Sequence, residues 1–438
     1  MIDYSAREQH GWYMYDFAHS AFSTTVVTLF LGPYLTVLAK AGADAHGMVH
    51  PLGIDIDARS YWSYLISLSV ILQVLFLPML GAVADYSRRK KELLGLVTYI
   101  GAVATIAMFF LQGRGYLWGG VLFLIANVTF GAGVTIYNSF LPEIAPREDR
   151  DTVSSKGWGM GYVGGGTLLA LNLLLYLNAS RIGMSDSMAV RISLCSAGAW
   201  WALFTIPTLV RLHNRGAAHA LPAGQSAIAT VVRQLAHTVG HMRGYPQTMR
   251  FVIAFLFYND AIQTVIALAS QFGNDELKIP ISQLTLAILM VQFVAFFGAI
   301  GFNALARLTT AKRAVAVSLV IWSVTLIYIY LEVRTTLQFF IMAAVVALVL
   351  GGSQALSRSL YAQLIPKFKE AEYYSIYEVT DKGTSWLCPL FFGLALQFTR
   401  SYRIAILSLI IFFLAGLFVL LSVDVERGER DVALAQNV

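Results

Sequence analysis

Apolar residues occupy long stretches of this chain, and short polar connections separate them. A helix needs about 20 mostly apolar residues to cross a hydrocarbon core of about 30 Å. The pattern therefore predicts an all-α membrane protein. We expect twelve membrane-spanning helices near residues 12–39, 61–84, 93–112, 116–140, 157–178, 191–210, 250–272, 282–306, 314–331, 337–360, 373–398 and 403–423.

A polar stretch divides the predicted helices six and six, which indicates two bundles joined by a linker. We expect two pseudo-symmetric six-helix bundles. The predicted parts are an N-terminal bundle at 1–212, a cytoplasmic linker at 213–248, a C-terminal bundle at 249–424 and a cytoplasmic tail at 425–438.

The two predicted bundles show a weak internal repeat. A shift of 220 residues superposes Gly131, Ser139 and Pro146, at the end of the fourth predicted helix, on Gly351, Ser359 and Pro366 of the tenth. The first and seventh predicted helices also both open with a polar cluster. Duplicated bundles around a central site are typical of secondary transporters.

Composition and charge fit this interpretation. Hydrophobic residues make up 57% of the chain and charged residues 13%, whereas soluble domains carry about 25% charged residues, which excludes a soluble enzyme. With the N-terminus inside, 20 Lys and Arg residues fall on the inner side and 9 on the outer side. This bias predicts a multi-pass protein with both termini cytoplasmic, in a bacterial inner (plasma) membrane. It also explains the net charge of +6 without nucleic acid.

One carboxylate lies deep in a predicted span. Asp260 is ten residues beyond Arg250, about 15 Å along a helix, and an ionisable group at that depth costs about 2.5 kcal/mol or more unless it faces water or a partner. We expect Asp260 to line a cavity, to contact the solute and to take up a proton during the cycle. The alternative is a structural acceptor of hydrogen bonds from neighbouring helices. Other residues at similar depth that we expect to contact the solute are Tyr258, Asn259, Gln263, Asn127 and Gln292.

The first predicted helix carries a second polar cluster near its inner end. Asp16, His19 and Ser20 follow one another within two turns, so we expect them to contact the solute or a gate. The alternative is that the hydroxyl groups of this region bond back to their own helix.

A signature loop follows the second predicted helix, with the sequence GAVADYSRRKK at 81–91. Gly81 permits close helix approach, Asp85 can face a helix N-terminus, and Arg88 and Arg89 can pair with acids of a neighbouring helix. An ordinary cationic inner loop would explain the cations but not Gly81 and Asp85 at this spacing. The loop resembles the signature of the major facilitator superfamily, in which it latches the cytoplasmic side shut.

Further stretches resemble one branch of that superfamily, the vacuolar amino-acid effluxers linked to autophagy. They are 12–22 (WYMYDFAHSAF), 138–143 (NSFLPE), 258–260 (YND), 352–359 (GSQALSRS) and 382–393. The resemblance implies the major facilitator fold, alternating access and export of amino acids or related metabolites. The expected partners are a small solute, protons and membrane lipids, and we expect a monomer.

The second half departs from the latch pattern. Asn303 and Arg307 stand where the repeated loop would carry Gly and Asp. Near the inner face, Arg358 ends the tenth predicted helix, and Glu378 and Asp381 open the next one. We expect Arg358 to pair with one of these acids as an inner gate, the alternative being an arginine that snorkels to the interface.

Other patterns are set aside. The GxGxxG match at 157–166 opens a membrane helix, where Gly161 and Gly165 instead offer a surface for close helix packing. The histidine pairs His46 and His50, and His237 and His241, lack a third ligand at fixed spacing, so we expect no metal and no cofactor. No paired catalytic residues emerge, so we expect no enzyme. A lipid or lysolipid flippase on the same scaffold and a non-transporting membrane sensor remain as alternatives.

Overall fold

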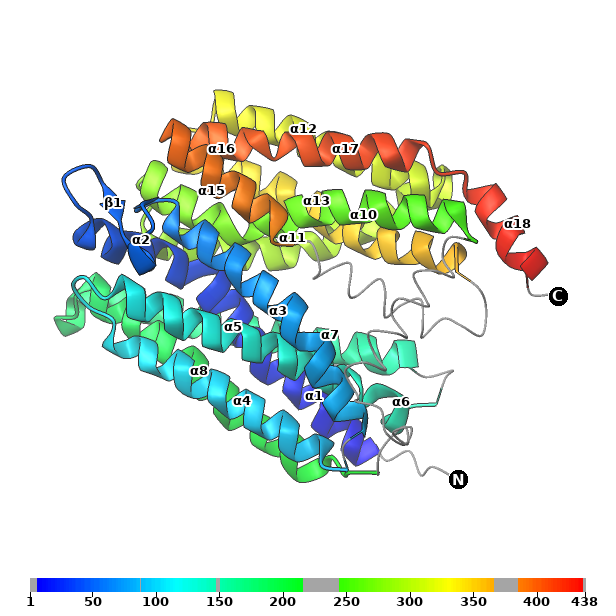
Figure 1. Cartoon of the computed structure of the whole chain (residues 1–438), viewed down its shortest axis with the longest axis horizontal. Coiled ribbons are helices and arrows are strands. Elements are labelled where there is room, and N and C mark those ends of the chain that lie inside the picture. Colours follow the sequence, from blue (N-terminus) through cyan, green and yellow to red (C-terminus); the bar gives the residue numbers. More distant parts are fainter. Residues whose placement is uncertain (1–5, 87, 147–149, 216–243, 366–384, 436–438) are drawn as a thin grey trace. The chain divides into compact units, whose positions relative to one another are not determined.

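The computed structural model describes residues 6–86, 88–146, 150–215, 244–365 and 385–435, and nearly all of them are helical (Figure 1). The chain divides into two compact units. The first comprises Met1–Val232 with Pro280–Leu286, and the second comprises Arg233–Ile279 with Ala287–Val438.

The first unit begins with one long helix that changes its winding in the middle. Its α-helical ends, α1 and α2, flank a nine-residue π-helical segment, and together they form a continuous apolar span, Ala6–Gly42. The remaining elements are a short β-hairpin and further helices. Their bounds are α1 Ala6–Ala21, α2 Leu31–Gly42, β1 Met48–Val49, β2 Ile56–Asp57, α3 Tyr61–Tyr86, α4 Lys90–Ala107, α5 Tyr116–Asn138, α6 Leu141–Ile144, α7 Arg150–Ala179 and α8 Asp186–Arg211.

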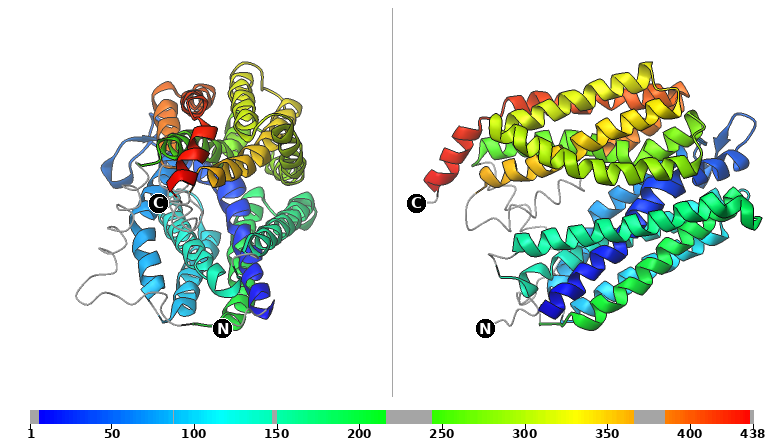
Figure 2. Two further views of the ribbon diagram at one scale, coloured as in Figure 1. Left: turned by 90° about the vertical axis from the view of Figure 1, so that its right-hand side faces the viewer. Right: turned by 180° about the vertical axis from the view of Figure 1, so that it is seen from behind.

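The second unit repeats the pattern of long apolar helices. In Figures 1 and 2, α17 runs alongside both α10 and α12. The bounds are α10 Pro246–Gln271, α11 Ile281–Leu308, α12 Ala311–Leu331, α13 Thr336–Gln363, α15 Leu387–Thr399, α16 Tyr402–Ser408, α17 Ile410–Leu421 and α18 Val425–Ala435. The last of these lies in the segment predicted as a tail and packs against α10 and α13.

Ten helices of the described residues are long and apolar enough to cross a membrane, and two shorter apolar helices, Tyr61–Leu77 and Leu387–Thr399, match the second and eleventh predicted spans. The observed helices generally extend beyond the predicted ranges. Hydropathy detects only the part of a helix that matches hydrocarbon, whereas the backbone continues through the polar turns at its ends. The first part of the eleventh predicted span lies outside the described residues.

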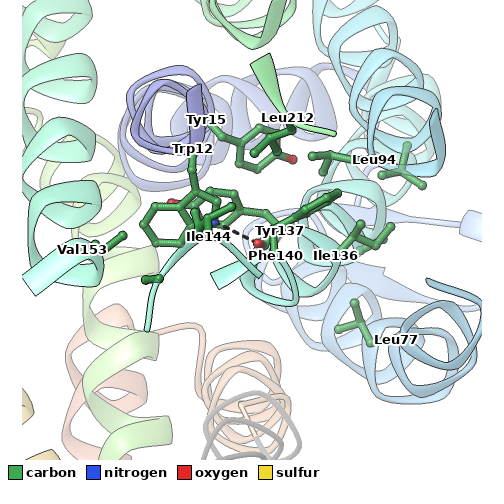
Figure 3. Packing of buried hydrophobic residues seen from close by; sticks show 13 residues of the cluster. Trp12, Tyr15, Leu77, Leu94, Ile136, Tyr137, Phe140, Ile144, Val153 and Leu212 are labelled. Atoms are coloured by element: carbon green, nitrogen blue, oxygen red, sulfur yellow. Dashed lines mark hydrogen bonds between the residues drawn. The ribbon is translucent and has the colours of Figure 1, made fainter. Parts of the chain in front are cut away.

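An aromatic core joins α1 to α5 within the first unit (Figure 3). Trp12 and Tyr137 stack with ring centroids 4.3 Å apart, and the indole N–H of Trp12 donates to the Tyr137 backbone oxygen at 3.0 Å. Tyr15 also stacks on Tyr137, with ring centroids 4.8 Å apart. Such ring pairs stabilise packing beyond their buried area. The polar cluster near the start of α1 therefore lies beside closely packed aromatic rings.

The glycines of α7 bring it close to α1. A Cβ at Gly161 would lie 2.6 Å from the Ser20 hydroxyl, and one at Gly164 would overlap the backbone of Phe17. Gly165 lies against Thr24 in the same way. The prediction that the glycine-rich start of this helix is a packing surface is confirmed.

The hairpin between α2 and α3 carries His46 and His50. His50 lies between two acids, with its Nδ1 atom 2.8 Å from Asp55 Oδ1 and its Nε2 atom 3.3 Å from Asp44 Oδ2. The hydrogen bond with Asp55 raises the pKa of His50 from 6.5. The backbone N–H of Met48 lowers the pKa of Asp44. Acids therefore hold His50 in this exposed hairpin. No group of three or more metal-ligating side chains suited to a metal ion occurs among the residues that the structure describes.

Candidate functional site

Each unit carries a carboxylate on its first long helix, Asp16 on α1 and Asp260 on α10. Both follow a buried tyrosine in a polar cluster, and both lie inside an apolar span. An acid in such a position must be paired, hydrated or neutral. What surrounds each carboxylate therefore decides what it can do.

In the first unit, Asp16 is held by α5. The Tyr137 hydroxyl donates to Asp16 Oδ2 at 2.5 Å, and 14% of the Asp16 side chain is exposed. His19 Nδ1 lies 3.8 Å from Asp16 Oδ1 and 3.0 Å from the Tyr15 backbone oxygen. Because a carbonyl only accepts, Nδ1 carries the hydrogen. The cluster thus combines an acid, an imidazole and a phenol within one helical turn of α1 and the end of α5.

The predicted residues of α1 all face neighbouring helices. Asp16 and Ser20 point toward the glycines of α7, since a Cβ at Gly157 would overlap Asp16 and one at Gly161 would meet Ser20. His19 stacks between Tyr15 and Phe130 at 5.1 and 5.2 Å. These three residues therefore gather at one place in the first unit.

In the second unit, Asp260 is 2% exposed and meets the beginning of α15. Its Oδ2 atom accepts a hydrogen bond from the backbone N–H of Cys388 at 2.9 Å. Its Oδ1 atom is buried and has no hydrogen-bond partner among the described residues. The Asp260 backbone oxygen accepts from the Thr264 hydroxyl at 2.8 Å. The carboxylate thus has one satisfied and one unsatisfied oxygen.

The expectation that Asp260 lines a cavity stays a prediction, because in this conformation the carboxylate is enclosed within the second unit. A small apolar void of about 20 Å³ lies one turn further along α10, lined by Thr264, Phe272, Met342 and Phe392 among others, and Asp260 is not part of it. Close packing of α15 against α10 encloses the carboxylate. Counting residues along a helix gives the depth of Asp260 in the membrane. It does not reveal that the end of another helix lies beside it.

The neighbours of Asp260 differ in their roles. The Tyr258 hydroxyl lies 2.6 Å from the Ser357 hydroxyl of α13, which ties the two helices together. Asn259 is 2% exposed, whereas Gln263 is half-buried. Gln292 is half-buried on α11. Tyr258, Asn259 and Gln263 share α10 with Asp260, whereas Gln292 lies on α11.

Asn127 belongs to a separate polar network in the first unit. Its side-chain N–H₂ donates to the Ser69 hydroxyl of α3 at 2.8 Å, and its backbone oxygen accepts from Gln73 at 3.1 Å. Buried polar groups need such partners because unmade hydrogen bonds are costly in hydrocarbon. Asn127 therefore joins α5 to α3.

The weak repeat has a structural counterpart in each unit. Tyr137 and Ser357 are 220 residues apart, and each forms a hydrogen bond with the first long helix of its own unit. Tyr137 bonds to Asp16 of α1, and Ser357 bonds to Tyr258 of α10. Gly131 packs against Gln73 of α3, and Gly351 packs against Ala295 of α11, which is the second long helix of the other unit. Sequence analysis placed the repeat but missed Tyr137, whose equivalence to Ser357 was the available signal.

The loop predicted to act as a latch is partly described. Gly81 and Asp85 lie in the last turns of α3, and their side chains fall outside the described residues. Arg88 and Arg89 are exposed. The buried cation of this loop is instead Lys90, whose ammonium lies 2.5 Å from Glu143 and above the Phe140 ring. Sequence analysis named Lys90 in the motif and missed its partner.

A second charge cluster holds the chain that leaves α8. The Glu8 side chain is 4% exposed, and its carboxylate lies 2.5 Å from the Arg215 guanidinium and 3.1 Å from the His213 ring. Arg215 also donates to the backbone oxygen of Glu143. Arg358 on α13, in contrast, is exposed and has no ion pair within the described ranges. Its expected partners, Glu378 and Asp381, lie outside them.

The helical layout defines the class of protein. Solved structures with the same layout include the nucleoside transporter NupG, with a TM-score of 0.66 and 14% identity, covering 95% of this chain and 98% of that one. A D-xylose-proton symporter has a TM-score of 0.68 and 12% identity, covering 97% and 99%. The chain is an integral multi-pass membrane protein with the twelve-helix fold of the major facilitator superfamily.

The family follows from sequence comparison. The family model described as "Vacuole effluxer Atg22 like" matches residues 4–433, and the chain belongs to this family. The MFS-type transporter YxiO of Bacillus subtilis strain 168 is 30% identical over 440 residues, covering 100% of this chain and 99% of the relative. Autophagy-related protein 22-1 of Penicillium rubens is 25% identical, covering 99% and 93%. The chain is thus a membrane transporter of the major facilitator type, and the resemblance predicted from its motifs is confirmed.

Proposed function

We propose that this transporter exports a small solute, an amino acid or a related metabolite, by alternating access and couples export to protons. The family description supports efflux, and the resemblance of its motifs supports the solute class. Both termini face the cytoplasm in this proposal. The observation that carries it is the buried Asp260 carboxylate, which has one hydrogen bond and an unsatisfied oxygen.

A charge in this position is costly unless something compensates it. The described residues offer Asp260 no cation, and the N–H of Cys388 provides only one hydrogen bond. An ionised carboxylate in hydrocarbon is destabilised relative to its protonated form, so a change in water access would change its protonation. Asp260 is thus suited to load a proton from one side and release it to the other.

The other predicted residues take supporting roles in this proposal. Asp16, His19 and Ser20 form the contact region of the first unit, and Tyr258, Asn259 and Gln263 form that of the second. Asn127 and Gln292 contribute at the same depth. The loop with Gly81, Asp85, Arg88 and Arg89 latches the cytoplasmic side, and Arg358 closes an inner gate with Glu378 or Asp381.

The test uses reconstituted protein and the variant Asp260→Asn. Asparagine keeps an oxygen that accepts from the Cys388 N–H but cannot exchange a proton, so pH-driven uptake into proteoliposomes should be abolished while expression and folding persist. Asp186→Asn, an exposed acid of α8, is the matched control and should transport normally. Unaltered pH-driven transport in Asp260→Asn would remove the proton role.

A further inference from the structure

Asp260 forms a tertiary cap for α15. The helix begins at Leu387, after a turn at Ser385 and Trp386, and its second residue donates its N–H to Asp260 Oδ2. The first N–H groups of a helix have no partner within the helix, and its N-terminus carries partial positive charge. A carboxylate from α10 therefore satisfies the start of α15.

The third position of α15 strengthens this dependence. Pro389 has no backbone N–H, so this helix start presents fewer donors than an ordinary one. Since Leu390 already bonds back to Trp386, Cys388 is a principal donor that needs a partner outside the helix. Asp260 Oδ2 fills that need and is thereby committed to a structural contact.

The second carboxylate oxygen of Asp260, Oδ1, differs from Oδ2 in its hydrogen bonding. Oδ1 is buried and unpartnered among the described residues, on a side chain that is 98% buried. Ionised, it is an acceptor with no donor at hydrogen-bond distance and angle, although the Thr264 hydroxyl and the Cys388 thiol lie near the carboxylate. Protonated, it becomes a donor without an acceptor, so a proton removes the charge and leaves the hydrogen bond unmade. A ligand group that donates a hydrogen bond and carries positive charge satisfies both needs.

Few titratable groups compete for this oxygen. The thiol of Cys388 lies next to the carboxylate. The helix α17, which packs most extensively on α10, contains no titratable residue, and on α13 the nearest cation by sequence, Arg358, is exposed. The described surroundings therefore offer Oδ1 no cation of the protein itself.

We propose that Asp260 Oδ1 is an exchange site at which a proton and a protonated amine of the solute compete, while Oδ2 stays on the Cys388 N–H. The inference rests on the proposed function and narrows its substrates to solutes with a basic amine. One positive charge replaces another at the same oxygen, so release of the amine accompanies uptake of the proton. The cap on α15 persists through the exchange.

The binding test uses purified protein and chemically matched probes. The twenty amino acids and their decarboxylated amines are each compared with their N-acetylated forms by thermal shift at pH 7.5. A ligand that binds only the folded protein raises its melting temperature. At least one free amine should stabilise the protein, and its N-acetylated form, which carries no charge on that nitrogen, should not. Equal stabilisation by the acetylated form, or no stabilisation by any amine, rejects the site.

The pH dependence tests the competition. When one proton competes for one oxygen, the apparent Kd of the amine should rise about tenfold for each pH unit on the acid side of the titration. The rise should vanish in Asp260→Asn and persist in the exposed control Asp186→Asn. A Kd of the wild-type protein that does not change between pH 5 and pH 8 overturns the proposal.

Two further variants separate the charge from the cap. Asp260→Asn retains an acceptor for Cys388 and should melt near the wild-type temperature without ligand, whereas Asp260→Leu also removes the cap and should melt lower. In a Cys195→Ser background, the amine should change the rate at which a maleimide labels Cys388. An unchanged rate with a bound amine places that amine elsewhere and rejects the site. Transport of an uncharged solute, with no amine bound, would reject this inference and leave the proposed transporter function standing.

Discussion

At the scale of single residues, the two membrane carboxylates are held in opposite ways. Asp16 accepts from a phenol and lies near an imidazole, so side chains of its own unit satisfy it. Asp260 accepts from a helix start and keeps one oxygen without a partner among the described residues. We therefore expect Asp16 to keep its hydrogen bond with Tyr137, and Asp260 to exchange a proton for the amine of a solute.

The bond between Tyr137 and Asp16 predicts a stability effect. Tyr137→Phe keeps the stacked ring and leaves Asp16 Oδ2 without its donor. Removing a hydrogen bond to a charged group costs about 1.5–3 kcal/mol, so the free energy of unfolding should fall by that amount. Equilibrium unfolding in detergent measures it. Tyr162→Phe, an exposed tyrosine of α7, is the control and should change stability by less than about 0.5 kcal/mol. Equal losses in both variants would contradict the role of the bond.

The hairpin between α2 and α3 should depend on pH through His50. The hydrogen bond with Asp55 raises the pKa of His50, so its stabilising contribution is complete below the ordinary value of 6.5 and is lost as the pH rises through the raised value. Hydrogen exchange of residues 44–57 should therefore quicken on the alkaline side, after correction for intrinsic rates. The variant His50→Asn should show no such change, and an identical profile in the variant would refute the assignment.

At the scale of elements, glycines and helix ends decide how the helices meet. The helix α7 packs on α1 through the glycines between Gly157 and Gly165, which allows Asp16 and Ser20 to lie close to the α7 backbone. The start of α15 depends on a carboxylate from α10. Apolar helices therefore differ in the contacts that fix their position.

The contact between α7 and α1 can be tested with a pair of glycines. A side chain at Gly164 would overlap the backbone of Phe17, whereas one at Gly166 meets nothing within 4 Å. Gly164→Leu should destabilise the protein by about 1–3 kcal/mol or prevent folding, as overpacking does. Gly166→Leu should be tolerated. Size-exclusion profiles and melting temperatures distinguish the two, and similar behaviour of both variants would exclude the close approach.

At the scale of the whole molecule, the chain consists of two units built from equivalent helices. The fourth long helix of each unit contacts the first through residues 220 apart in sequence, Tyr137 and Ser357. Two such units joined by a polar linker are the architecture of the major facilitator superfamily. The proposed exchange at Asp260 is a local event that this architecture would convert into transport.

Orientation in the membrane is a prediction of the whole chain. Lys and Arg concentrate on one side, which should be the cytoplasm. In a bacterial inner membrane, green fluorescent protein fused after residue 435 should fluoresce, and alkaline phosphatase fused after Gly183, between α7 and α8, should be active. The reverse pattern would invert the predicted topology.

The amino-acid sequence was sufficient to predict the membrane class, the helix positions and the family. Each of these predictions rests on the length of apolar stretches, on the distribution of Lys and Arg, or on short motifs such as that at 81–91. These features can be recognised without knowing which helices pack together. It also located Asp260, because depth along a helix is a count of residues.

The contacts that these residues make depend on the tertiary structure. The hydrogen bond from Cys388 to Asp260 joins residues 128 positions apart, and the pairing of Glu8 with Arg215 joins residues 207 positions apart. Packing of neighbouring helices also makes Asn127 a link between α3 and α5 and encloses Asp260. Partners of this kind depend on which helices pack together, and that choice is made by side chains spread over the whole unit rather than by any local pattern.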